Sequence, residues 1–227
     1  MQFRRYGIYY TPRPGALADF GAAWLGWDLA RGQVTAHPVI PHLPRPIADI
    51  TATPRKYGLH GTIKPPFFLA NGRREDSLND ALAALCDAHA PVTLNGLKLS
   101  RIGSFIALTI DGDQTRLADL AGKAVRELDA FRAPPSESEL ARRRKSNLSP
   151  RQEELLAQWG YPYVMDEFRF HITLSGRLGN EAEATMSTLL PHITPLLPSP
   201  FILDSLSLVG EDEDGLFHEI QRHTLTG

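Results

Sequence analysis

Two short segments of the chain, each of the form His-x-Thr, carry side chains suited to acid and base chemistry. Side chains alternate across a β-strand, so the histidine and the threonine of each segment would share one face. A neutral imidazole can remove a proton from water or a sugar hydroxyl, and an imidazolium can protonate a leaving oxygen. Threonine hydroxyls can donate hydrogen bonds to phosphate oxygens. The segments therefore predict phosphodiester cleavage without a metal or cofactor, with His60, Thr62, His171 and Thr173 as catalytic residues and a bell-shaped pH profile around neutrality.

The two segments occupy equivalent places in an internal repeat. Ile106 follows His60 at the interval at which Phe217 follows His171, and each half is predicted to run strand, helix, strand, strand. If the halves pack as a pseudo-symmetric pair, the polar faces of their first strands oppose each other across a cleft. A third His-x-Thr segment begins at His192, but it ends a predicted helix and is followed by prolines, so we interpret it as accidental.

Hydrophobic periodicity and turn residues predict a chain of alternating strands and helices that contains these two segments. Predicted strands cover residues 6–10, 56–64, 92–99, 105–110, 168–175, 201–209 and 215–221. Predicted helices cover residues 77–89, 114–131 and 181–190. An earlier helix has an apolar stripe from Leu17 to Trp27, with Gly32 just past its end. Five prolines between residues 37 and 54 predict an extended connector, and Pro65 with Pro66 is expected to stop the strand at 56–64.

A polar insert at residues 134–163 separates the two halves and contains two helix-start signals. Ser136 is followed three residues later by Glu139, and Ser149 by Gln152, which are capping-box arrangements. The insert is therefore predicted to form two short helices, the second ending at Gly160.

The same insert contains four consecutive cations, Arg142 to Lys145. Such a run is self-repelling unless an anion lies nearby, and arginine binds phosphate in a bidentate manner. Arg142 and Arg143 are therefore candidate ligands of a substrate phosphate. The alternative is a solvated helix face balanced by Glu137 and Glu139.

Five other side chains are candidate substrate ligands. By strand alternation, Lys64, Arg169 and Ser175 share the faces of the proposed catalytic residues. Lys64 and Arg169 could equally point past the sheet edge into solvent. Tyr163, just before the second catalytic strand, could stack on a ring of the substrate or pack its own loop, and Tyr10 at the end of the first strand has the same two interpretations.

Composition narrows the classes of function. The 24 Lys and Arg against 26 Asp and Glu give a formal charge of -2, which argues against a general nucleic-acid coat. The first residues lack the apolar core of a leader peptide, and no apolar run approaches the roughly 20 residues of a membrane span. The single cysteine, Cys86, can form neither an internal disulfide nor a thiolate metal cluster. We expect a cytoplasmic protein of one domain, a monomer, with no membrane partner.

The two motifs and their flanks resemble a known family. The segments KYGLHGTIKPPF and FRFHITLSG are similar to the paired H-x-T/S-x motifs of the two-histidine (2H) phosphoesterase superfamily, which includes RNA 2',3'-cyclic phosphodiesterases. With the long insert between them, they most resemble the branch associated with bacterial phosphonate-metabolism (carbon-phosphorus lyase) genes. The resemblance extends from Tyr6 to the last predicted strand.

This resemblance implies an α+β fold of two pseudo-symmetric lobes, each an antiparallel sheet with flanking helices, with the catalytic cleft between them. We expect lobe one at residues 57–131, the helical insert at 134–163, lobe two at 164–227, and residues 1–56 packed on the lobes as a strand and helix. The resemblance also implies metal-independent chemistry by His60, Thr62, His171 and Thr173.

The hypothesis is a metal-independent phosphodiesterase that hydrolyses a small anionic cyclic phosphate. The resemblance suggests 5-phosphoribosyl 1,2-cyclic phosphate as a candidate. An RNA or nucleoside 2',3'-cyclic phosphodiesterase is the first alternative; nucleic acid is not favoured because the chain lacks a basic excess. A non-catalytic module that binds a phosphosugar or an RNA end is the second alternative. The residues alone do not say which histidine is the base.

Overall fold

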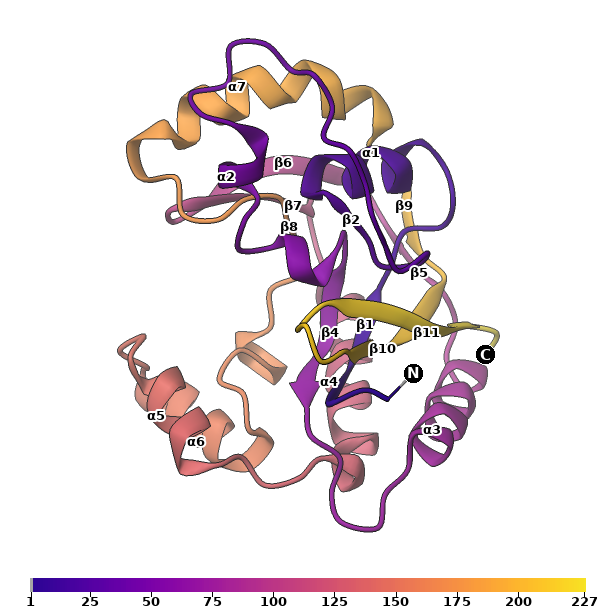
Figure 1. The fold of residues 1–227 in the computed structure, drawn as a ribbon. Helices are drawn as coiled ribbons and strands as arrows, with labels where there is room; N and C mark the ends of the chain where they lie inside the picture. The colour runs from indigo at the N-terminus through magenta and orange to yellow at the C-terminus, as the bar shows by residue number, and fades with distance from the viewer. Residues whose placement is uncertain (1) are drawn as a thin grey trace.

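The computed structural model describes residues 2–227 and has the predicted α+β fold, built around one seven-stranded sheet. The strand order is β11-β10-β1-β4-β8-β7-β6, and every neighbouring pair is antiparallel (Figure 1). The strands are β1 (Arg5–Tyr10), β4 (Gly61–Phe67), β6 (Leu97–Ile102), β7 (Phe105–Ile110), β8 (His171–Thr173), β10 (Ser205–Glu211) and β11 (Phe217–Thr224). Two short pairs lie outside this sheet: β2 (Trp27–Asp28) with β3 (Gln33–Val34), and β5 (Val92–Leu94) with β9 (Phe201–Leu203).

Helices cover the two ends of the sheet separately. They are α1 (Ala16–Leu25), α2 (Ile47–Ile50), α3 (Glu75–Asp87), α4 (Thr115–Glu127), α5 (Glu137–Arg144), α6 (Pro150–Trp159) and α7 (Ala182–Ile193). α3 packs on β10 and β11, α4 packs on β4, and α7 packs on β6 and β7. Figure 1 shows α7 at one end of the molecule and α3 and α4 at the other, so the chain forms two lobes. Within residues 2–227, no helix is both long and apolar enough to cross a bilayer.

The two halves of the sheet meet where the His-x-Thr segments lie. β4 pairs with β8 at Gly61 and Ile172, the middle residues of the two segments. Ile172 is completely buried, so its neighbours in sequence face the opposite side of the sheet. The antiparallel register puts the histidine of each segment across from the threonine of the other. The two segments are therefore adjacent on the sheet and present their polar side chains to one face.

The strands do not follow the predicted division into lobes at residues 57–131 and 164–227. β6 and β7 pair with β8 from the other half of the sequence, while β10 and β11 join β1 and β4. β1 is buried along nearly its whole length and needs a partner on both sides. It occupies the other edge of β4, so the β6–β7 hairpin extends the sheet from β8 instead. In each half of the sequence the observed order is strand, helix and then three strands, because each predicted middle strand is split in two: β5 and β6 in the first half, β9 and β10 in the second.

Three local predictions differ from the structure. α1 ends at Gly26, not near Gly32, because Gly26 adopts a left-handed conformation (φ 81°) and its N–H caps the carbonyl of Ala22. β4 continues through Pro65 and Pro66, because the register of β1 against β4 shifts there and a bulge accommodates prolines. The proline-rich connector is also not fully extended, since it includes α2.

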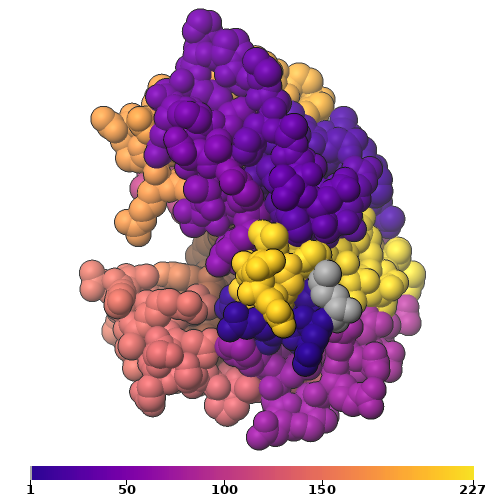
Figure 2. Space-filling model, viewed as in Figure 1, coloured from indigo at the N-terminus to yellow at the C-terminus, as the bar shows by residue number. Residues whose placement is uncertain are grey.

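The insert forms the two predicted helices, α5 and α6. Ser136 and Ser149 each accept a hydrogen bond from the backbone of the residue three positions on, in complete capping boxes, and α6 ends at Gly160. Leu155 and Leu156 are fully buried, which anchors α6 to the body. Figure 2 shows α5 and α6 as an arm, with a hollow between this arm and the lobe that carries α7.

Candidate functional site

The hollow beside the insert is a cleft of about 1110 Å³ that contains most of the predicted catalytic residues. His60, Thr62 and Thr173 line it. His171 is not among the lining residues, but its ring centroid lies 6.0 Å from that of Phe105, which is. The structure therefore brings the two His-x-Thr segments together at the cleft, but as neighbouring strands of one sheet that share a face, not as the opposing faces that the sequence predicts.

His60 is held on three sides. Its Nδ1 lies 3.0 Å from the carbonyl oxygen of Gly58, and its Nε2 lies 3.2 Å from Oγ1 of Thr62. The ring of Tyr9 stacks on the imidazole with centroids 4.0 Å apart, and the ring of Tyr57 lies 5.7 Å away. A carbonyl oxygen can only accept, so Nδ1 carries the proton and Nε2 of the neutral ring is an acceptor. Thr62 then donates its hydroxyl to this nitrogen.

His171 is held in the corresponding way. Its Nδ1 lies 2.8 Å from the carbonyl oxygen of Arg169, two residues earlier in the chain. This is the same offset as that between His60 and Gly58, so both imidazoles have a protonated Nδ1 and leave Nε2 for other partners. Two imidazoles with the same tautomer and the same anchoring suit a pair that exchanges protons with one ligand.

The environment of His60 favours its neutral form. Burial lowers the pKa of His60 to about 4, the bond to the Gly58 carbonyl opposes this shift, and the nearby His171 adds to it. A neutral imidazole at neutral pH can accept a proton, whereas it has none to give from Nε2. This environment suits His60 to the role of a general base.

Positive charge dominates the cleft. Its walls include six Lys or Arg residues and one carboxylate, that of Asp49. Arg142 and Arg143, predicted from the insert, are among the six, and Tyr163 also lines the cleft with its side chain exposed. Ser175 lines the cleft as well, although its Oγ already accepts from the N–H of Ile106 and donates to the carbonyl of Gly176.

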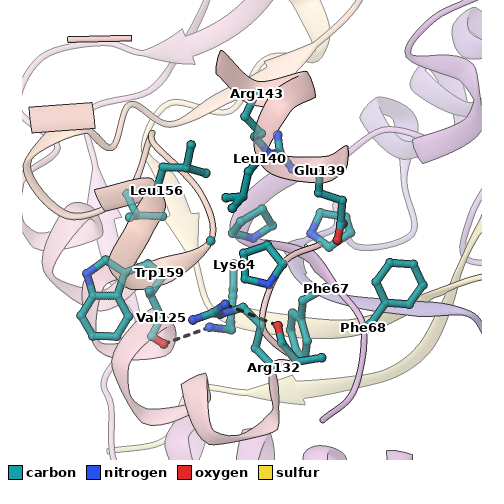
Figure 3. Close-up of a pocket in the computed structure, with 16 residues that line it drawn as sticks. Lys64, Phe67, Phe68, Val125, Arg132, Glu139, Leu140, Arg143, Leu156 and Trp159 are labelled. Atoms are coloured by element: carbon teal, nitrogen blue, oxygen red, sulfur yellow. Dashed lines mark hydrogen bonds between the residues drawn. The ribbon is translucent and has the colours of Figure 1, made fainter. Parts of the chain in front are cut away.

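Three predicted ligands lie elsewhere. Lys64 shares the face of His60 but is 2% exposed, and its Nζ donates to the carbonyl of Val125 at 3.0 Å, as Figure 3 shows. Arg169 is not a cleft residue, and its guanidinium donates to the carbonyls of Asp166 and Phe168. Tyr10 is buried, and desolvation raises its pKa to about 12. Strand alternation gives the face of a side chain but not what covers that face.

Lys64 is therefore predicted to stabilise the fold rather than bind substrate. Its Nζ also forms an ion pair with Asp129 at 3.3 Å, and burial lowers its pKa to about 8 against the opposing effect of Asp129. Lys64→Met leaves the Val125 carbonyl without its donor, so the free energy of unfolding should fall by about 1–3 kcal/mol. Urea unfolding measures this change. Turnover by the folded variant should stay within about twofold of wild type.

Lys98→Met is the matched control for Lys64→Met, because Lys98 forms an exposed ion pair with Asp111 and should change stability by less than about 1 kcal/mol. Unchanged stability together with a tenfold or larger loss of turnover in Lys64→Met would restore the substrate-binding interpretation.

Sequence reasoning missed several cleft residues. Tyr9, rather than Tyr10, faces the site, because Tyr9 is in register with Thr62 across β1 and β4. Tyr57 and Lys56 come from the turn of 3-10 helix just before His60. Strand alternation within residues 6–10 separates Tyr9 from Tyr10, but the sequence alone does not say which of the two faces the first His-x-Thr segment.

Among residues 2–227, no group of three or more His, Cys, Asp or Glu side chains is placed to hold a metal ion. The single cysteine, Cys86, is buried.

Two curated proteins match nearly the whole chain. It is 34% identical over 231 residues to a ribose 1,5-bisphosphate phosphokinase PhnN of Janthinobacterium sp. (strain Marseille), covering 98% of this chain and 51% of that protein. It is 32% identical over 220 residues to the protein of the same name from Laribacter hongkongensis (strain HLHK9), covering 93% of this chain and 49% of that protein. The chain thus spans about half the length of the curated relatives it matches.

Solved structures similar to this chain include one described as a phosphoesterase, with a TM-score of 0.45 and 16% identity. Another is E. coli LigT complexed with 3'-AMP, with a TM-score of 0.46 and 16% identity. Both comparisons cover 100% of each chain. A family model described as "Protein of unknown function (DUF1045)" matches residues 62–218, which is more than half of the sequence. The chain therefore belongs to the DUF1045 family.

Proposed function

We propose that this protein is a metal-independent phosphodiesterase that opens a small cyclic phosphate by two-histidine acid and base catalysis. The observation that carries the proposal is the pair of matched imidazoles, His60 and His171. Each has Nδ1 tied to a backbone carbonyl two residues earlier, and their segments are joined by one backbone pairing in a cationic cleft. An anionic substrate with a labile P–O bond suits this arrangement.

The proposed reaction assigns a role to each histidine. Nε2 of His60 accepts a proton from a water molecule, whose oxygen attacks phosphorus. The P–O bond opposite the incoming oxygen breaks, and the imidazolium of His171 gives its proton to the departing sugar oxygen. One water is consumed and a phosphate monoester with a sugar hydroxyl is formed. When the substrate binds, the Thr62 hydroxyl turns from Nε2 of His60 to a non-bridging oxygen, and its hydrogen bond, with that of Thr173, offsets the charge there.

The curated relatives support a phosphoribosyl substrate. Their name gives ribose 1,5-bisphosphate as the compound they phosphorylate. Hydrolysis of 5-phosphoribosyl 1,2-cyclic phosphate at the bond to O2 yields ribose 1,5-bisphosphate. A chain related to half of such a protein would then supply the compound that the kinase consumes. The kinase activity itself is not proposed for this chain, since its sequence contains no G-x-x-x-x-G-K-[ST] phosphate loop.

The test is phosphorus NMR of purified protein with a panel of cyclic phosphates in the presence of EDTA. The panel contains ribosyl 1,2-cyclic phosphates with and without a 5-phosphate, and nucleoside 2',3'-cyclic phosphates. Conversion of a ribosyl 1,2-cyclic phosphate to a 1-phosphate that survives chelation supports the proposal. Turnover of the nucleoside compounds alone favours the RNA-type alternative. Binding without turnover of any member favours the non-catalytic module.

The pH dependence follows from the environment of His60. Because its pKa in the folded protein is about 4, below the ordinary value near 6.5, His60 stays neutral through the range from pH 7 down to about 5. The acidic limb of kcat/KM should then fall toward pH 4 rather than near 6.5. Histidine-selective NMR titration checks this directly. Removing His171 should raise the pKa of His60, and an unshifted value near 6.5 in wild type would contradict the assignment.

A further inference from the structure

Arg143 is a half-buried cation in the cleft wall with no carboxylate partner among the described residues. Its neighbour Arg144 forms an ion pair with Glu153 at 3.0 Å, but within residues 2–227 no carboxylate oxygen lies within 4.0 Å of a nitrogen of Arg142 or Arg143. Burial lowers the pKa of Arg143, as expected for a charge without a close anion. An unneutralised guanidinium at this position implies that an anion binds there in the working protein.

Glu139 caps its own helix and does not pair with Arg143. Glu139 is four residues before Arg143, a spacing that usually allows a helical ion pair. Its Oε2 instead accepts from the backbone N–H of Ser136 at 3.0 Å and from the Ser136 hydroxyl, completing the capping box of α5. Glu139 therefore acts on Arg143 only through its charge at a distance, which opposes the effect of burial on the pKa of Arg143, and forms no ion pair with it.

An aromatic wall orients Arg143 toward the cleft. Its guanidinium carbon lies 4.3 Å from the centroid of the Tyr161 ring, and Tyr161 packs edge-on against Tyr163 at 5.7 Å. All three residues line the cleft. Stacking on an aromatic face fixes the plane of a guanidinium while leaving its N–H groups available to a phosphate.

Lys56 and Tyr57 line the same cleft close to His60. Lys56 Nζ lies 4.8 Å from the centroid of the Tyr57 ring, and the Tyr57 ring lies 5.7 Å from that of His60. Both residues line the cleft. Arg142, Arg143 and Lys56 thus line the same cleft as His60, and the Tyr57 ring lies beside both Lys56 and the His60 imidazole. Cations placed in this way suit a second anionic group on a ligand whose reacting phosphate is at the histidines.

We propose that Arg143, supported by Arg142 and Lys56, forms a second anion subsite that binds the non-reacting phosphate monoester of the substrate. This inference rests on the proposed function, because it assigns the cyclic phosphate to the histidines and the terminal phosphate to the insert. The insert then selects phosphorylated sugars over their unphosphorylated analogues. Arg143 is a specificity-determining residue and takes no part in proton transfer.

The test separates binding from catalysis by using ribose 5-phosphate, which has the terminal monoester and no cyclic phosphate. Isothermal titration should give at least tenfold weaker binding for Arg143→Gln than for wild type, with Arg143→Lys between them. Arg144→Gln is the matched control, since Arg144 is outside the cleft and paired with Glu153; its affinity should stay within about twofold. His60→Gln should also keep its affinity if the monoester sits at the insert.

Several results would overturn the subsite. The first is that wild type shows no measurable affinity for ribose 5-phosphate at millimolar concentration. The second is that Arg143→Gln binds it as tightly as wild type does, or loses no more affinity than Arg144→Gln. The third is that His60→Gln loses binding. Failure of the proposed function looks different: no cyclic phosphate is turned over, yet Arg143→Gln still weakens ribose 5-phosphate binding. If turnover is found, the preference for the 5-phosphorylated substrate should shrink at least tenfold in Arg143→Gln.

Discussion

His60→Ala and His171→Ala should each lower kcat/KM for the cyclic phosphate by about 10³-fold or more, because each removes one of the two proton transfers. The ring of His60 stacks on Tyr9 and is bonded to Gly58, and the ring of His171 is bonded to Arg169, so alanine at either position removes an imidazole that is held in place. Phosphorus NMR or a coupled phosphate assay measures the loss.

The third His-x-Thr segment provides a matched control for the histidine variants. His192 lies exposed near the end of α7 and outside the cleft, so His192→Ala should keep wild-type turnover. The double variant of His60 and His171 should lose little more than either single variant, since residues that act as one unit are not additive. More than a tenth of wild-type activity in either single variant would exclude the two-histidine scheme.

That the two His-x-Thr segments lie together could be predicted from the sequence, because the prediction depended on their equal spacing within the two halves and on the period of two in a strand. The equal spacing of His60 and His171 within the halves, and the alternation that turns each histidine and threonine to one side, hold without knowing any tertiary contact. The capping boxes of the insert could also be predicted from the sequence, because Ser136 and Ser149 each cap the helix that follows them directly in the chain.

Other parts of the site depended on contacts that are distant in sequence. Lys64 has the correct face but is covered by α4 and the 3-10 turn after it, where the Val125 carbonyl and the Asp129 carboxylate bind its ammonium group. The choice between Tyr9 and Tyr10 depended on the register of β1 against β4, which contains a bulge. The exchange of hairpins between lobes had the same origin, because no local pattern reveals that β1 would occupy the edge of β4.

The glycine between His60 and Thr62 follows from this geometry. A Cβ at Gly61 would lie 2.3 Å from Cε2 and 2.4 Å from Cζ of Phe170. The Phe170 ring is 2% exposed and packs against the rings of Tyr10 and Phe201, so it has little room to retreat. Gly61 also makes the register pair with Ile172 that joins β4 to β8. A side chain here would therefore press β4 and β8 apart.

Gly61→Ala should accordingly damage stability and catalysis together. Overpacking should lower the free energy of unfolding by about 1–3 kcal/mol, and a displacement of one histidine relative to the other should lower kcat/KM by about 10²-fold. Adding Phe170→Leu makes space for the methyl group, so the double variant should recover most of the kcat/KM of Phe170→Leu alone. Denaturant unfolding and phosphorus NMR on the three variants complete the cycle.

Wild-type turnover by Gly61→Ala would mean that the contact of β4 with β8 does not set the distance between the histidines. Recovery in the double variant would instead show that the clash with Phe170 causes the loss. The two strands can then hold His60 and His171 over one phosphate only because residue 61 has no side chain.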